Sequence, residues 1–285
     1  MKVFVTGRGG QLASEFEKLK GKDLDWTFLS AKDLDITNEV LVRNFFENKQ
    51  VDYIINCAAY TAVDKAEDDI ESAYAVNEKG VKHLIEVCKT TNAKFIHYST
   101  DYVFDGESSE PYTEYHKVDP QSIYGKSKLA GEELLRKEKA VNSIIIRTAW
   151  VYSNFGHNFV KTMLRLGNEK SELEIVADQV GSPTFAQDLA KDTLKVIEDT
   201  NYKWKNADIF HYSNEGSCSW YDFAQHIFDF AGIEVKLNSL STEEFPTRAT
   251  RPKFSLLDKT RFKKTFNVEI KDWKSSLLNM LKSEL

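Results

Sequence analysis

Residues 1–20 carry a strand, a glycine turn and a helix in immediate succession. The apolar run 1–6 leads into Gly7-Arg8-Gly9-Gly10, and residues 11–20 then have helical spacing with one apolar side, formed by Leu12, Phe16 and Leu19. Such a turn lets backbone N–H groups approach a pyrophosphate, and the helix N-terminus favours its negative charge. The start of the chain therefore predicts a dinucleotide site.

The glycines have the wider T-G-x-x-G-x-x-[GA] spacing, not the commoner G-x-G-x-x-G. Gly7 and Gly10 are three residues apart, and the next step falls on Ala13, where the helix would pack on the strand. An ordinary strand-to-helix turn would use the same glycines, so the loop alone leaves both interpretations open.

Strand and helix patterns continue to alternate along the first half of the chain, without hairpin signals. Apolar strand runs cover residues 26–30, 51–57, 94–98 and 143–152, and a helix is expected over 70–80. This alternation predicts an α/β fold with a parallel sheet and right-handed crossovers, whose ligands sit beyond the carboxyl ends of the strands. We therefore expect a Rossmann-type doubly wound parallel sheet with a smaller C-terminal α/β substrate lobe.

The alternation becomes less regular after Trp150. Helices are expected at 158–166, 187–197, 221–231 and 273–281, and short strands at 172–176, 209–213 and 235–237. We expect residues 1–150 to form an NADP(H)-binding Rossmann domain and residues 151–285 to form largely the substrate-binding lobe. Pieces around 184–214 are expected to return to the first domain.

Composition and charge exclude several classes of protein. The 285 residues carry a net charge of −6, with Lys and Arg interspersed among Asp and Glu, so no basic stripe suggests nucleic acid. No apolar run approaches membrane-spanning length, and the chain opens on a strand without a signal peptide, which predicts a cytoplasmic protein with no membrane partner. The three cysteines and six histidines lack metal-site spacing, so no metal is predicted.

Two stretches carry groups suited to carbonyl reduction. Ser99 and Thr100 follow the strand run 94–98, while Tyr124 and Lys128 stand four residues apart on one face of a predicted helix. A free phenol titrates near pH ~10, so a tyrosine needs a stabilised anion to act as an acid–base group at neutral pH. The Y-x-x-x-K pattern alone also fits a solvated helix face. Because it follows a dinucleotide loop and a strand-end hydroxyl pair, we predict that Tyr124, Lys128 and Thr100 are catalytic.

The second predicted strand ends in Ser30, where NAD-binding folds often place an acid for the ribose 2′-OH. Since no carboxylate ends this strand, and Arg8 and Lys32 lie in reach of that corner, we expect NADPH, with NADH possible. Asp35 is either an acidic residue at the N-terminus of the next helix or a group that recognises the adenine amine of the cofactor.

Several other positions keep two interpretations. Ala58 and Ala59 either allow close approach of a nicotinamide-ribose unit or form a tight loop. Trp150 and Tyr102 either pack within the protein or contact a sugar ring. Arg251 either pairs with a diphosphate through its bidentate fork or forms a surface ion pair.

Together these motifs resemble those of the extended short-chain dehydrogenase/reductase family, and within it most closely the dTDP-4-dehydrorhamnose reductase subfamily. The resemblance covers nearly the whole chain and is carried by residues 6–12, 33–36, 56–67, 99–106, 124–128, 147–152, 178–184 and 251–258. Ala13 in place of a third glycine, and Arg8-Gly9 in place of Ala-Asn, depart from the family pattern.

The resemblance implies an oxidoreductase that reduces the C4 keto group of dTDP-4-dehydro-β-L-rhamnose with NADPH. The product would be dTDP-β-L-rhamnose, for cell-surface polysaccharide biosynthesis. Tyr124 would be the proton donor and Lys128 its partner, and the substrate would contact Thr100, Asp101, Tyr102 and Trp150. The cofactor would be bound by Gly7, Gly10, Gln11, Leu12, Asp35, Ile36, Ala58, Ala59, Tyr60, Thr61, Ser99, Tyr124 and Lys128.

The same resemblance implies a nucleotide-sugar substrate as the small-molecule partner of a monomer or homodimer. Some relatives dimerise through a divalent metal held by glutamates. Glu15 matches one of these positions, but the others cannot be placed in the sequence, so this metal is not predicted either.

Other functions stay open on the same fold. A 4,6-dehydratase typically needs a further carboxylate after Thr100-Asp101, where this chain has Tyr102, and a 4-epimerase holds NAD tightly, which Ser30 disfavours. A reductase that makes another 6-deoxysugar stereoisomer is poorly separated by sequence. A non-catalytic dinucleotide-binding regulator is disfavoured by the intact Tyr124/Lys128 pair.

Overall fold

The computed structural model describes residues 1–283, and its centre is a six-stranded parallel sheet in the order β10-β5-β4-β3-β1-β2. The strands are β1 (Lys2–Thr6), β2 (Asp25–Leu29), β3 (Tyr53–Asn56), β4 (Lys94–Thr100), β5 (Ser143–Thr148) and β10 (Asp208–Tyr212). All their pairings are parallel. The strand order reverses between β1 and β3, the point at which open α/β sheets bind ligands. The predicted Rossmann-type sheet is confirmed.

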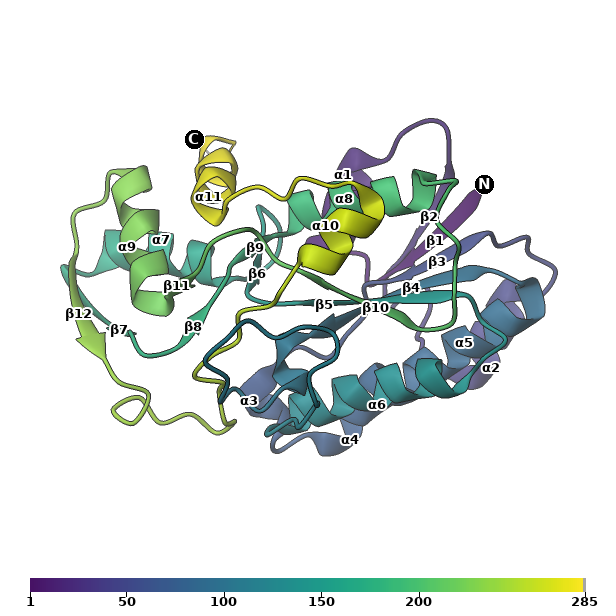
Figure 1. Ribbon diagram of the computed structural model, residues 1–285, viewed down its shortest axis with the longest axis horizontal. Coiled ribbons are helices and arrows are strands. Elements are labelled where there is room, and N and C mark those ends of the chain that lie inside the picture. The colour runs from purple at the N-terminus through teal and green to yellow at the C-terminus, as the bar shows by residue number, and fades with distance from the viewer. Residues whose placement is uncertain (284–285) are drawn as a thin grey trace.

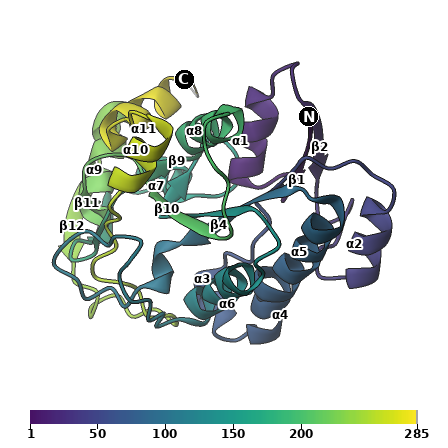
Figure 2. The same ribbon diagram turned by 45° about the vertical axis from the view of Figure 1, so that its right-hand side comes forward.

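Helices cover both faces of this sheet (Figures 1 and 2). One face carries α1 (Gln11–Leu19), α8 (Ala186–Glu198) and α10 (Thr260–Phe266), and the other carries α2 (Glu39–Phe46), α5 (Gly80–Thr91) and α6 (Ile123–Lys137). Because side chains alternate across a strand, Val3 and Val5 enter the first core while Phe4 enters the second. Burial on both faces explains why these strands read as nearly continuous apolar runs.

A second, smaller lobe lies beside the carboxyl ends of the strands (Figure 1). It contains α7 (Phe159–Glu169), β7 (Glu172–Val176), α9 (Trp220–Ala231), β12 (Lys236–Leu240) and α11 (Trp273–Lys282). Its own core includes Phe223, Ile227, Trp273 and Leu277. Strands β7 and β12 of the lobe pair in parallel. Two shorter pairings form separate two-stranded sheets: β6 (Val151–Tyr152) with β9 (Thr184–Phe185), and β8 (Val180–Gly181) with β11 (Cys218–Ser219).

Pieces of the later chain lie with the first half. Helix α8 packs against α1, and β10 forms the edge of the main sheet beside β5. The division of the chain at residue 150 stays a prediction. Among residues 1–283, no helix has the length and apolar character needed to cross a membrane.

Three local features differ from the predicted elements. The expected strand over 143–152 is interrupted, because Trp150 takes a left-handed backbone with φ +48° between β5 and β6. The expected helix over 70–80 is α4 (Ile70–Tyr74) followed by a π-helix at Ala75–Lys79. Helix α10 was not expected, since its seven residues carry too short an apolar pattern to identify.

Candidate active site

A cavity of about 690 Å³ follows the carboxyl ends of the central strands. All predicted cofactor residues except Tyr60 line it: Gly7, Gly10, Gln11, Leu12, Asp35, Ile36, Ala58, Ala59, Thr61, Ser99, Tyr124 and Lys128. These residues come from the segments that follow β1, β2 and β3, from the start of α1, from the end of β4 and from α6. The structure therefore brings the predicted loop, strand ends and helix face together around one space.

The glycine loop is shaped for close backbone approach. Gly7 has φ +78°, and a Cβ atom there would lie 2.7 Å from the backbone nitrogen of Ala58. No other residue type fits that contact and that dihedral without strain. The loop thus lies directly against the chain leaving β3, and its backbone and the N-terminus of α1 form the cradle that a pyrophosphate requires.

Tyr60 supports the cavity through its backbone. Asn77, buried in the π-helix, accepts a hydrogen bond from Tyr60 N at 2.9 Å and donates one to Tyr60 O at 3.1 Å. Its amide also donates to Ser127 Oγ on α6 at 2.9 Å. One buried side chain therefore ties the loop after β3 to the helix that carries Tyr124 and Lys128, and π-bulges often occur at such functional positions.

The proton-handling groups meet at the end of β4. Thr100 is the last residue of β4, and α6 begins at Ile123, so Tyr124 lies in its first turn and Lys128 one turn later. Gly125 allows this approach, since a Cβ atom there would lie 2.2 Å from the carbonyl oxygen of Tyr102. The start of α6 therefore packs closely against the segment after β4.

Burial sets the charge state of this pair. It raises the pKa of the Tyr124 phenol above its ordinary value, and a hydrogen bond with Thr100 opposes the rise. It also lowers the pKa of Lys128 to about 8, opposed by Glu132 and Cys57. At pH 7 the phenol therefore keeps its proton and the ammonium is charged. Lys128 donates to the carbonyl oxygen of Tyr98 at 2.6 Å.

The predicted substrate residues beside them lie at the join of the two lobes. Asp101 is 2 % exposed and accepts a hydrogen bond from Thr100 Oγ1 at 2.9 Å. The ring of Tyr102 meets the ring of Tyr124 edge to face, with centroids 5.5 Å apart. Arg251 donates to Tyr102 Oη at 3.1 Å and pairs with Asp64 at 2.5 Å. The surface ion pair expected as one alternative for Arg251 is thus present, and it links the lobes.

Trp150 stacks on another tryptophan that the sequence did not single out. The rings of Trp150 and Trp220 are nearly parallel, 10° apart, with centroids separated by 3.5 Å. A Cβ on Gly181 would lie 2.7 Å from Ser255 Oγ and 2.9 Å from the Trp150 indole, so these side chains are packed together. A bulky residue with positive φ is uncommon and often marks a functional position. Trp220 covers one face of the indole, which leaves less of Trp150 for a sugar ring.

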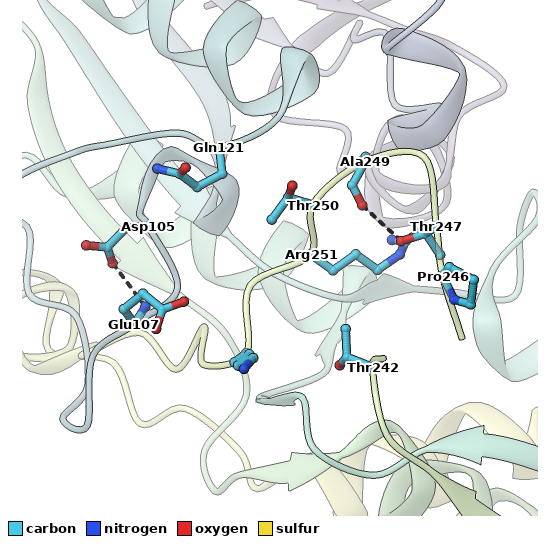
Figure 3. Close-up of a pocket in the computed structure, with 10 residues that line it drawn as sticks. Asp105, Glu107, Gln121, Thr242, Pro246, Thr247, Ala249, Thr250 and Arg251 are labelled. Carbon is cyan, nitrogen blue, oxygen red and sulfur yellow. Dashed lines mark hydrogen bonds between the residues drawn. The ribbon is translucent and has the colours of Figure 1, made fainter. Parts of the chain in front are cut away.

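A second cavity, of about 780 Å³, lies in the smaller lobe. Its apolar lining is Phe159, Met163, Leu166, Leu173, Ile175, Val176, Trp220, Leu240 and Phe245. Arg251 lines this cavity and also a neighbouring one of about 450 Å³. Figure 3 shows Arg251 in that neighbouring cavity, between the loop of Asp105 and Glu107 and the segment of Thr247. An aromatic and aliphatic pocket beside a guanidinium suits a nucleoside attached to phosphates.

The corner at the end of β2 differs from expectation. The sequence predicted a corner without a carboxylate, but Asp33 Oδ2 accepts hydrogen bonds from Ser30 N at 2.9 Å and Ser30 Oγ at 2.6 Å. That expectation was wrong because the acid belongs to the turn after the strand. Arg8, which lines the cofactor cavity, pairs with Glu17 at 3.0 Å.

The smaller lobe adds residues to the cofactor cavity that were not predicted. Val151, Gly156 and His157 line it, and Asn158 donates to Gln11 Oε1 at 3.1 Å. The only sequence signal for Gly156, His157 and Asn158 was the glycine-containing turn before a predicted helix, which is too common to interpret.

Glu15 is buried on α1, where Gln187 of α8 donates to its carboxylate at 3.2 Å. Within residues 1–283, no three His, Cys, Asp or Glu side chains are grouped as metal ligands would be. The Glu15 carboxylate is therefore engaged by an amide from α8.

The model of the family described as the RmlD substrate binding domain matches residues 1–285. Among curated proteins, the chain is 40% identical over 281 residues to a spore coat polysaccharide biosynthesis protein, SpsK, of Bacillus subtilis, covering 98% of this chain and 96% of that protein. It is also 40% identical over 291 residues to the dTDP-4-dehydrorhamnose reductase of Aggregatibacter actinomycetemcomitans, covering 98% of each.

A solved structure of dTDP-4-dehydrorhamnose reductase from Bacillus anthracis, in complex with NADP, superposes with a TM-score of 0.93. Its sequence is 38% identical, and the match covers 99% of both chains.

Proposed function

The chain belongs to the RmlD substrate binding domain family, and from that premise we propose that it reduces the C4 keto group of dTDP-4-dehydro-β-L-rhamnose with NADPH. The product is dTDP-β-L-rhamnose. The observation that carries this proposal is the meeting of Ser99, Tyr124 and Lys128 on the wall of one dinucleotide-sized cavity. Thr100, the last residue of β4, lies beside that wall, close enough to Tyr124 to influence the pKa of its phenol.

The lining of the cavity supports the binding of a dinucleotide cofactor. Gly7, Gly10 and the start of α1 cradle the diphosphate, while Ala58 and Ala59 leave room for the nicotinamide half. Bound NADPH supplies the hydride for the carbonyl carbon. The chain's own residues hold the sugar, exclude water and manage the proton.

Tyr124 gives its phenolic proton to the oxygen of the reduced carbonyl. Burial keeps the phenol neutral beforehand, so the proton is present when the substrate binds. The Lys128 ammonium, one helical turn away, stabilises the negative charge that develops on the phenol oxygen. Its hydrogen bond to Tyr98 O fixes that ammonium in place.

The nucleotide part of the substrate fits the second cavity. The thymine base lies among the aromatic and aliphatic side chains of this cavity. Arg251 contacts the diphosphate between the cavity and Tyr124. The sugar then reaches Thr100, Asp101, Tyr102 and the exposed part of Trp150. To bind phosphate, the guanidinium shifts part of its interaction away from Asp64.

Two features favour reduction over dehydration. Dehydratases typically place a carboxylate where this chain has Tyr102, and here the Tyr102 phenol accepts a hydrogen bond from Arg251. Burial raises the pKa of Tyr102 to about 12, so it does not act as a base near neutral pH.

We further assign residues 1–150, with the pieces around 184–214, to cofactor binding and residues 151–285 largely to substrate binding. A cytoplasmic setting is supported by cysteines 57, 88 and 218, which form no disulfide within residues 1–283. The protein acts as a monomer or homodimer.

The direct test supplies dTDP-4-dehydro-β-L-rhamnose and NADPH to the purified protein and follows consumption of NADPH. Parallel assays with keto-sugars of other configurations separate this reaction from that of a reductase making a different stereoisomer. A regulator that only binds the dinucleotide would consume no NADPH with any of them.

A further inference from the structure

Asp101 is a buried carboxylate without a cationic partner. It is 2 % exposed, and its Oδ1 accepts a hydrogen bond from Thr100 Oγ1 at 2.9 Å. Its Oδ2 is buried and meets no hydrogen-bond partner among residues 1–283. A carboxylate in such a place is costly to ionise, and unpaired groups of this kind gather at functional sites.

The groups that face Asp101 come from three parts of the chain. Thr100 and the Tyr102 phenol belong to its own segment, the Tyr124 phenol comes from α6, and the Ser255 hydroxyl comes from the loop after Arg251. The Arg251 guanidinium itself is bound to Tyr102 and Asp64. Burial raises the pKa of Asp101 to about 6, although the nearby hydroxyls of Thr100 and Ser255 act to lower it. The carboxyl can therefore exchange a proton close to physiological pH.

The Thr100 hydroxyl donates to this carboxyl at 2.9 Å, accepts from Tyr102 N at 3.2 Å, and lies close enough to the Tyr124 phenol to act against the rise of its pKa. A hydroxyl has one proton to donate and two lone pairs to accept with. When Asp101 is ionised, the Thr100 proton points to Asp101, and Thr100 can only accept from Tyr124. When Asp101 is neutral, it can donate to Thr100, whose own proton then points to the Tyr124 oxygen.

We propose that Asp101 returns the proton that Tyr124 loses in each reduction, and that this proton passes through the Thr100 hydroxyl. The inference rests on the proposed reductase function, in which NADPH provides the hydride. The Tyr124 O–H bond breaks as an O–H bond forms on the reduced sugar oxygen. The Thr100 proton moves to the Tyr124 oxygen, and the Asp101 proton moves to Thr100. Asp101 is left as a carboxylate and takes its next proton from water.

With this relay, kcat decreases in two steps as the pH rises. As pH rises through the pKa of Asp101, the neutral carboxyl is lost and Tyr124 is reprotonated by a slower route from water, so kcat falls to a lower plateau. Loss of the Lys128 ammonium lowers kcat again at higher pH. Asn at position 101 can still accept from Thr100 but has no proton to release.

The test measures kcat against pH for Asp101→Asn, Thr100→Val and Thr100→Ser. Asp101→Asn is expected to lower kcat at pH 6 about tenfold or more, remove the lower-pH step, and leave the KM for NADPH within about twofold. Thr100→Val is expected to lower kcat by the same factor, whereas Thr100→Ser keeps a hydroxyl and should retain most of the activity. The double variant Asp101→Asn/Thr100→Val should have a kcat no lower than that of Thr100→Val alone. Ser255→Ala is the matched control: it keeps the relay and should move the lower step to higher pH without removing it.

A second measurement needs no turnover. Nuclear magnetic resonance of the protein labelled with ¹³C at aspartate Cγ should contain a carboxyl signal that titrates near pH 6 and is absent from Asp101→Asn. An unchanged kcat profile in Asp101→Asn overturns the relay while leaving the reductase function intact. A carboxyl that stays ionised down to pH 4 overturns the relay whatever the substrate. Absence of NADPH consumption by the wild-type protein instead overturns the proposed function.

Discussion

Lys128 Nζ lies 2.6 Å from the carbonyl oxygen of Tyr98, and this hydrogen bond fixes the only ammonium on the wall of the cofactor cavity among residues 1–283. The side chain is 3 % exposed, and Glu132, one helical turn further along α6, is engaged by Arg147. Burial therefore outweighs the nearby acid and brings the pKa of Lys128 into the range where activity is measured.

The first prediction concerns the pH dependence of Lys128. Its pKa is lowered to about 8, so the ammonium is present below that pH and is lost as pH rises through it. Because the charge stabilises the developing phenolate, kcat should fall about tenfold per pH unit above pH 8. Steady-state assays from pH 6 to 10 test this, with stability checked at each pH. A kcat that stays level to pH 10 would show that the ammonium has no part in the reaction.

The second prediction is that Asp101→Asn stabilises the protein. Burial raises the pKa of Asp101 from 3.8 to about 6, so the folded protein favours the neutral acid. The stability that this preference contributes is complete below pH 3.8 and is lost as pH rises through 6. At pH 7 the folded wild type therefore carries an ionisation cost of about 3 kcal/mol, which the amide avoids.

Urea unfolding of both proteins at pH 4, 5, 6 and 7 measures this difference. The free energy of unfolding of Asp101→Asn relative to wild type should grow with pH over this range. A constant difference would mean that Asp101 titrates normally.

The third prediction concerns the buried pair of Arg147 on β5 and Glu132 on α6. Two hydrogen bonds of 2.9 and 2.6 Å join them, and both side chains are at most 1 % exposed. Arg147→Met leaves the Glu132 carboxylate buried without a partner, so the free energy of unfolding should fall by roughly 3–5 kcal/mol. The double variant Arg147→Met/Glu132→Leu should recover much of that loss. Urea unfolding of both variants tests this, and equal losses would contradict it.

The fourth prediction concerns the Trp150–Trp220 stack. Trp220→Ala removes the ring that holds Trp150 and lines the nucleotide pocket, so the KM for the nucleotide sugar should rise about threefold to tenfold, with the KM for NADPH unchanged. Trp204→Ala is the matched control, because Trp204 packs on Tyr53 at the far side of the sheet core. Equal effects of the two substitutions on the KM for the nucleotide sugar would contradict the assignment of this pocket to the nucleotide.

The sequence predicted the main sheet and much of the cofactor site because both depend on local patterns. Strands buried on two faces give apolar runs, and Gly7 must be glycine for a dihedral and a contact within one turn. Tyr124 and Lys128 could be placed together because positions four apart share a helix face. These inferences needed no knowledge of how the smaller lobe folds.

The features that escaped prediction join distant parts of the chain. Trp220 lies 70 positions after Trp150. An ion pair was one alternative for Arg251, but its partner, Asp64, could not be identified from the sequence. The carboxylate of Asp33 reaches Ser30 through a turn whose shape the pattern of apolar residues does not encode. Such contacts depend on loop paths and lobe placement, which periodicity does not determine.

The most direct test of the proposed reductase is NADPH consumption by the wild-type protein and by Tyr124→Phe, each given dTDP-4-dehydro-β-L-rhamnose. The wild type should oxidise NADPH in proportion to the sugar supplied, with dTDP-β-L-rhamnose as the product. Tyr124→Phe should bind NADPH with similar affinity while its kcat falls about 10²- to 10⁴-fold, because the proton donor is gone. No NADPH consumption by the wild type, or full turnover by Tyr124→Phe, would contradict the account.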